Sequence, residues 1–107
     1  MFNGYQVSSH LVNERADRVA AIAMTMGFGE IRWRFAGSNE AGNRIEAVTT
    51  SGLIVVLSEN EKLIVTMYPA TVDKITALFA KLDKAVPPSL YQVLVKNKKK
   101  GYLELCK

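Results

Sequence analysis

Hydrophobic positions between residues 44 and 68 fall into three short runs that are separated by two polar breaks, at residues 51–52 and 59–61. Runs this short, rich in Val, Ile, Thr and Tyr, are typical of antiparallel strands joined by tight turns. The middle run, residues 53–57, has no polar alternation, which predicts a central strand covered on both faces. The third run alternates, so its side chains should form two opposite rows: Leu63, Val65 and Met67, and Ile64, Thr66 and Tyr68.

Two further patterns precede this segment. Residues 30–35 alternate strictly between polar and apolar, which predicts a strand ahead of the other three, followed by a loop over residues 37–43. Before that strand the spacing is helical, beginning near Ser9 and ending at the glycines Gly27 and Gly29. Residues 5–7 fit a short edge strand or an arm. The apolar stripe of the helix consists of Val12, Ala16, Val19, Ala23 and Met26.

The C-terminal third predicts two more helices. Thr71 is the expected N-cap of the first. Two prolines at residues 87–88 then break the chain, and Ser89 with Gln92 fits a capping box that opens a helix over residues 90–99. Gly101 fits the position after the end of that helix, and the segment of residues 102–105 fits a last edge strand or a frayed end.

These elements predict one α+β domain over residues 1–107. An N-terminal helix would pack on a four-stranded antiparallel β-meander, and two C-terminal helices would follow. A composition of 49% hydrophobic and 22% charged residues is ordinary for a globular chain and excludes wholesale disorder. No apolar run approaches the ~20 residues of a membrane-spanning helix, and the first residues lack the features of a signal peptide, so we expect a cytoplasmic protein.

The sequence contains few residues that could bind a metal or form a disulfide. The chain has one cysteine, Cys106, and one histidine, His10, which excludes an internal disulfide and a Cys/His zinc cluster. No phosphate-binding glycine loop or nucleophile elbow is present either. We therefore expect no metal and no cofactor.

The net charge of +4 is unevenly distributed. Residues 96–107 contain five lysines and one glutamate, a balance of +4, whereas the other 95 residues contain nine basic and nine acidic side chains. Such a cluster favours an anionic partner, although a solvated helix end is the commoner cause. The candidate basic patch consists of Lys96, Lys98, Lys99 and Lys100.

Two sets of residues could act on a phosphodiester. Arg32, Arg34 and Arg44 could form a ladder of guanidinium groups across neighbouring strands, or they could lie on an exposed face opposite acidic residues, depending on strand register. Thr66 and Tyr68 share a strand face, where their hydroxyls could contact a phosphate; hydroxyls on a half-buried strand are also common for β-propensity alone.

His10 stands at the opening of the first helix, with Glu14 one turn on. An imidazole can act as acid or base near neutral pH, and a carboxylate could hold its orientation. The alternative is a surface histidine near a helix cap, since a lone histidine has no intrinsic catalytic meaning.

The order of these features resembles a known group. Residues 8–11 (Ser-Ser-His-Leu), Arg15 and Arg18 on one helix, then the strands of residues 52–58 and 63–69, are similar to small phage and toxin–antitoxin proteins of the barnase/colicin/RelE-like ribonuclease superfamily. Two features depart from the group's pattern. Glu14 stands where its first arginine is usual, and two helices follow Tyr68.

The resemblance implies metal-independent RNA cleavage, in which a 2′-hydroxyl attacks the neighbouring phosphate. His10, Arg18 and Tyr68 would be catalytic, and Arg15, Arg32, Arg34, Arg44 and Thr66 would contact phosphate. We thus expect an RNA-directed protein with RNA, a host nucleoprotein complex or an antitoxin as its partner. The alternative is a non-catalytic phage or mobile-element protein that binds and inhibits a host protein or nucleoprotein complex. A third interpretation is a homodimer formed along an open sheet edge.

Overall fold

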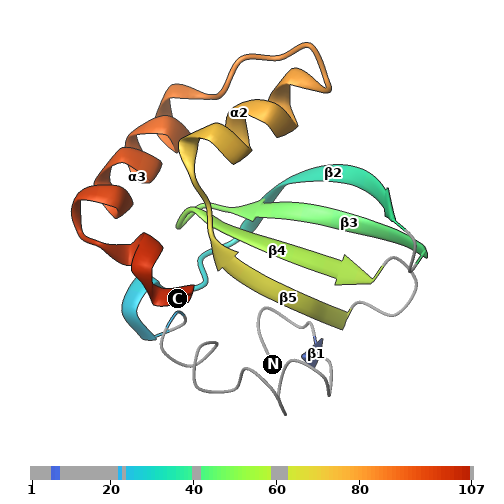
Figure 1. The fold of residues 1–107 in the computed structure, drawn as a ribbon, viewed down its shortest axis with the longest axis horizontal. Helices are drawn as coiled ribbons and strands as arrows, with labels where there is room; N and C mark the ends of the chain where they lie inside the picture. Colours follow the sequence, from blue (N-terminus) through green and yellow to red (C-terminus); the bar gives the residue numbers. More distant parts are fainter. Residues whose placement is uncertain (1–5, 8–21, 23, 40–41, 59–62, 107) are drawn as a thin grey trace.

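The structure is a computed structural model that describes residues 6–7, 22, 24–39, 42–58 and 63–106. Its strands form one sheet in the order β1-β5-β4-β3-β2 (Figure 1). The four strands β2 to β5 form an antiparallel meander, and β1 pairs in parallel with β5. The predicted α+β class and the four-stranded meander are therefore confirmed. The strand bounds are β1 Gln6–Val7, β2 Ile31–Asn39, β3 Gly42–Thr49, β4 Leu53–Ser58 and β5 Leu63–Pro69.

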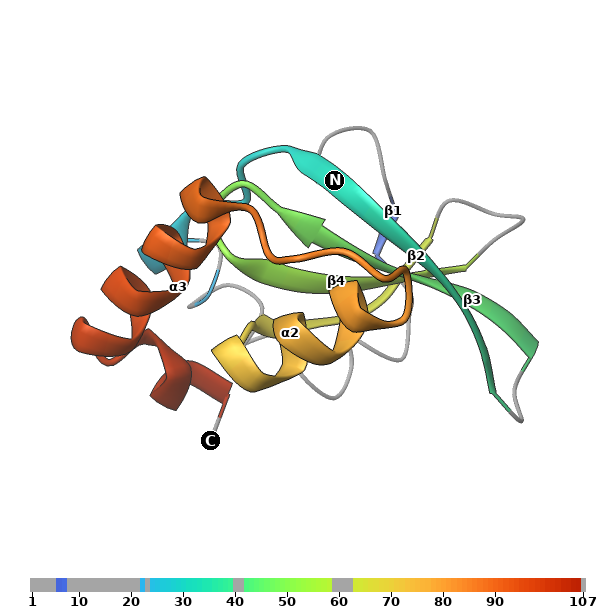
Figure 2. The same cartoon turned by 90° about the horizontal axis from the view of Figure 1, so that it is seen from above.

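Two helices follow the meander, α2 (Val72–Ala80) and α3 (Pro88–Lys99), and both lie over the same face of the sheet (Figures 1 and 2). The N-cap of α2 is as predicted, because Thr71 Oγ1 accepts a hydrogen bond from the backbone N–H of Lys74 at 3.1 Å.

Two predictions near the C-terminus are wrong. The N-cap of α3 is Pro87 and no side chain caps the helix, so the expected Ser89–Gln92 capping box does not form. The ring of Pro88, at the first helical position, already fixes a helical φ, and its missing N–H would have no partner within the helix, which explains the earlier start. The segment expected to be an edge strand or a frayed end is a 3-10 helix, η1 (Tyr102–Cys106).

The N-terminal helix is described only at its end. Ile22 and residues 24–26 are helical, and Gly27 follows with a φ of +74°. The rest of the predicted helix, from about Ser9, lies outside the described residues. Ile22 is 1% exposed and packs against the face of the sheet opposite α2 and α3.

The first hairpin is longer than predicted. Residues 37–39 pair with residues 42–44 in regular antiparallel register, so most of the expected loop is strand. The turn between β3 and β4 falls at the predicted polar break, where Gly52 N–H donates to the carbonyl of Thr49.

A β-bulge changes the predicted faces of β5. Val56 pairs with Thr66 but Leu57 pairs with Ile64, which leaves Val65 as the extra residue. The bulge reverses the alternation at that point, so Ile64 packs with Met67 rather than on the side of Thr66 and Tyr68. The prediction that Ile64 shares a face with the two hydroxyl residues is therefore wrong.

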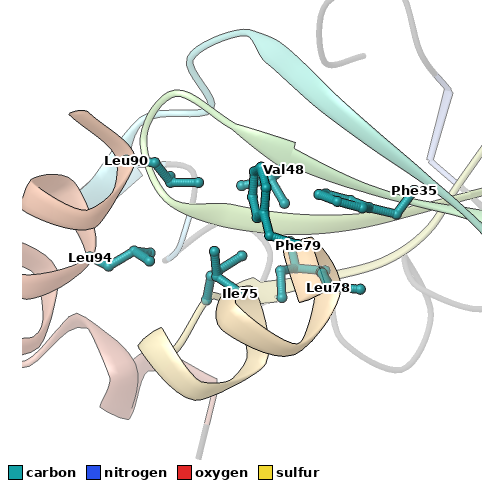
Figure 3. Close-up of a cluster of buried hydrophobic side chains, with 9 residues drawn as sticks. Phe35, Val48, Ile75, Leu78, Phe79, Leu90 and Leu94 are labelled. Atoms are coloured by element: carbon teal, nitrogen blue, oxygen red, sulfur yellow. The ribbon is translucent and has the colours of Figure 1, made fainter. Parts of the chain in front are cut away.

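The sheet separates two hydrophobic clusters, and β4 contributes to both as predicted. Leu53, Val55 and Leu57 pack on the N-terminal side, and Ile54 and Val56 pack beneath α2 and α3. On that second side, Phe79 of α2 makes an edge contact with Phe35, with ring centroids 5.0 Å apart (Figure 3). Among the described residues, no helix combines the length and the apolar character needed to cross a membrane.

Candidate functional site: the outer face of α3 and the polar face of the sheet

Helix α3 buries one face and presents the other to solvent. Leu90, Leu94 and Asn97 recur at helical spacing and are 1%, 1% and 6% exposed. The opposite side, around Tyr91 and Lys99, faces away from the sheet. The burial of two leucines thus fixes which side chains of α3 can meet a partner.

A shallow groove runs along this outer face. It has a volume of about 320 Å³, and Tyr91, the largest side chain in it, is 49% exposed. The lysine stems add apolar surface while their ammonium groups stay in solvent. The groove is lined by Tyr91, Gln92, Val95, Lys96 and Lys99.

The four lysines of the predicted basic patch do not act as one surface. Lys96 and Lys99 line the groove, whereas Lys98 lines a second depression of about 200 Å³, at the first turn of α2, together with Asp73. Lys100 lies with its Nζ 5.7 Å from the centroid of the Tyr102 ring, a cation–π contact. Only two of the four ammonium groups therefore flank the same apolar groove.

A second polar group lies on the sheet, on the face that α2 and α3 cover. Lys74 Nζ of α2 forms an ion pair with Glu46 Oε2 of β3 at 3.2 Å. Burial raises the pKa of the nearby Tyr68 phenol, while Lys74 lowers it and Glu46 raises it. Tyr68 therefore stays protonated at neutral pH and can donate a hydrogen bond.

Thr66 lies on the same face, two residues before Tyr68, as the sequence predicts. Its hydroxyl oxygen is buried and has no hydrogen-bond partner in the described part of the chain. A buried hydroxyl without a partner costs free energy, which sets Thr66 apart from the fully bonded Thr49.

The three arginines do not form the predicted ladder. Arg44 is two residues from Glu46 and lies on the α2 side of β3. Arg34 pairs with Ala47, whose side chain packs in the N-terminal cluster, so Arg34 lies on the opposite side of the sheet. Arg32 occupies a β-bulge of β2, with its guanidinium carbon 5.6 Å from the centroid of the Trp33 ring. Strand register therefore separates the guanidinium groups.

His10, Arg15 and Arg18 lie outside the described residues, so their proximity to Tyr68 or Arg44 stays a prediction. Within the described residues, no group of three or more His, Cys, Asp or Glu side chains is arranged to hold a metal ion.

No family model, curated protein or solved structure matches this chain.

Sequence reasoning missed Tyr91 as a candidate residue. Helical spacing could have found it, because Leu90 and Leu94 mark the buried face and Tyr91, Val95 and Lys99 then follow on the outer side. The Lys74–Glu46 ion pair was also missed, since it joins α2 to β3 and depends on how the helix crosses the sheet.

Proposed function

We propose that this protein binds RNA through the outer face of α3. The observation that carries the proposal is the groove that an exposed tyrosine, Tyr91, lines together with two lysines of the segment that holds the net charge of the chain. Neither feature alone indicates a nucleic acid. Together they offer a surface for a base beside two cations for phosphates.

The chemistry of the groove suits a single strand. An unpaired base can stack on the ring of Tyr91, and Lys96 and Lys99, further along α3 in the same groove, can contact the phosphates of the strand. Gln92 adds an amide that can hydrogen-bond a base edge or a 2′-hydroxyl. A duplex offers its phosphates but keeps its bases stacked, so it would use only part of the groove.

Cleavage of the bound RNA is the further step that the family resemblance implies. In this proposal the strand bound at α3 continues to the sheet face that carries Tyr68, whose phenol donates a hydrogen bond to phosphate, and His10 and Arg18 supply the acid–base and charge-neutralising groups. A chain that binds RNA without cleaving it would be the non-catalytic alternative. The two differ in whether His10→Ala abolishes cleavage while binding persists.

The test of RNA binding is fluorescence anisotropy with a labelled, unstructured oligouridylate at several salt concentrations. The double variant Lys96→Ala/Lys99→Ala should weaken binding about tenfold or more at about 0.1 M salt, and the dependence of log K on log salt should decrease by about 1.4. Lys81→Ala/Lys84→Ala is the matched control, because it removes the same charge from exposed lysines outside the groove.

Substitutions at Tyr91 distinguish the contribution of base stacking from that of charge. Tyr91→Phe should bind the oligonucleotide like the native chain, and Tyr91→Ala should bind it about tenfold more weakly with an unchanged salt dependence. Equal losses for the groove and control lysine pairs would mean that only overall charge matters, and would overturn the proposed site.

A further inference from the structure

Strand β2 ends the sheet, and its outer edge pairs with no other described strand. From Trp33 to Asn39 its pairing with β3 is continuous, so this stretch presents a regular extended backbone. The edge strand at the other end of the sheet, β1, is only two residues long and pairs with Leu63 and Ile64 of β5. An unpaired edge exposes alternate N–H and C=O groups that can pair with an added strand.

The start of this edge has a net positive charge, because Arg32 and Arg34 follow a single acidic residue, Glu30. Arg32 and Arg34 are both exposed, and Arg32 occupies the bulge that precedes the regular stretch. No acidic side chain lies within residues 31–39. A strand added to this edge would therefore meet two guanidinium groups and would be favoured by carboxylates placed opposite them.

The same charges act against pairing with a second copy of this chain. In an antiparallel pair of β2 strands centred on Trp33, Arg32 of each copy would lie opposite Arg34 of the other. Like charges directly opposite each other are destabilising, and a bulge further interrupts such pairing. The edge is thus protected against self-association in that register, while its backbone stays suited to a strand of opposite charge.

We propose that the outer edge of β2, over residues 33–39, binds an extended, glutamate- or aspartate-rich peptide segment of a partner protein as an added antiparallel strand. Main-chain hydrogen bonds along residues 33–39 supply the affinity, and carboxylates near Arg34, and near Arg32 in the bulge just before this stretch, select the acidic partner. This surface is separate from the groove of α3, so the inference does not depend on RNA binding.

The experiment uses the full chain and a capped seven-residue peptide of alternating glutamate and valine. Trp33 is the only tryptophan of the chain and belongs to β2 itself, so its fluorescence reports binding at this edge. Two further peptides are N-methylated at every second residue, one in each of the two alternating sets. Because a paired strand directs one set of N–H groups toward its neighbour, one methylated peptide should bind like the parent and the other should not.

Charge is tested separately. Arg32→Glu should weaken binding of the glutamate peptide about fivefold and strengthen binding of the corresponding lysine peptide. Lys96→Ala/Lys99→Ala should change the affinity for neither peptide. Slowed amide exchange on peptide binding should be confined to alternate residues of β2 within 33–39. Equal behaviour of the two methylated peptides, equal affinity for the lysine peptide, or a native chain that is already a dimer through β2 would each overturn the proposal.

Discussion

The side-chain amide of Asn97 donates a hydrogen bond from Nδ2 to the carbonyl oxygen of Ser51, 2.8 Å away. This contact joins α3 to the turn between β3 and β4. The hydroxyl of Ser51 in turn donates to the carbonyl of Phe28 at 3.0 Å, and it lies 2.8 Å from Thr49 Oγ1. One turn thus holds the helix on one side and the segment after the N-terminal helix on the other, which fixes where the outer face of α3 points.

Replacing Asn97 by alanine should destabilise the protein by about 1–2 kcal/mol, because Asn97 is 6% exposed and its loss leaves the Ser51 carbonyl without this donor. The higher helix propensity of alanine offsets part of the cost. Urea unfolding measures the difference, and Lys98→Ala, at an exposed neighbouring position, is the control. A loss below about 0.5 kcal/mol for Asn97→Ala would show that the contact does not hold the helix in place.

Gly52 should not tolerate a side chain. Its φ is +87°, and an added Cβ would lie 2.5 Å from Asn97 Nδ2 and 3.2 Å from Val93 Cγ1. Gly101 has a similar φ of +76° but open space around it, so Gly101→Ala measures the conformational cost alone. We expect Gly52→Ala to lose at least about 1 kcal/mol more than Gly101→Ala in urea unfolding, since it also displaces α3. Equal losses would mean that the turn and the helix can separate freely.

Much of the fold follows from local patterns of the sequence. Alternation at residues 30–35, the uninterrupted run at residues 53–57 and the threonine at position 71 each predicted an element that the structure contains. Such features depend on neighbours a few residues away, and hydrophobic periodicity records them directly.

The arrangement of the candidate site was harder to predict because it depends on register and helix placement. The bulge at Val65 reverses the face of Ile64, and the pairing of Arg34 with Ala47 separates that arginine from Arg44. The capping box failed for a different and local reason, because the adjacent Pro88 suits the first position of a helix. The bulge and the pairing of Arg34, by contrast, are not encoded in the spacing of the residues concerned.

Two threonines should respond in opposite directions to the same substitution. Thr49 Oγ1 accepts a hydrogen bond from the backbone N–H of Leu53 at 3.1 Å and bonds with Ser51, so Thr49→Val should cost about 1–3 kcal/mol. Thr66 Oγ1 is buried without a partner in the described part of the chain, so Thr66→Val should be neutral or stabilise by about 1 kcal/mol. Thermal unfolding compares the two midpoints. A clear loss of stability for Thr66→Val would mean that this hydroxyl forms a structural hydrogen bond in the folded protein and is not available as a donor.

Tyr68 should make stability depend on pH in alkaline solution. Burial is the main reason that its pKa lies above the ordinary value of 10.0, so the folded protein holds the phenolic proton more tightly than the unfolded chain does. The stabilising contribution is complete below pH 10 and is lost as the pH rises through the folded pKa, because the unfolded chain releases its proton first.

Tyr68→Phe removes this contribution, so the free energy of unfolding of the native chain should fall more steeply above about pH 10 than that of the variant. Urea unfolding between about pH 8 and pH 11.5 measures the two curves. Parallel curves for Tyr68→Phe would show that this phenol is as accessible to water in the folded protein as in the unfolded chain, and would contradict a pKa raised by burial.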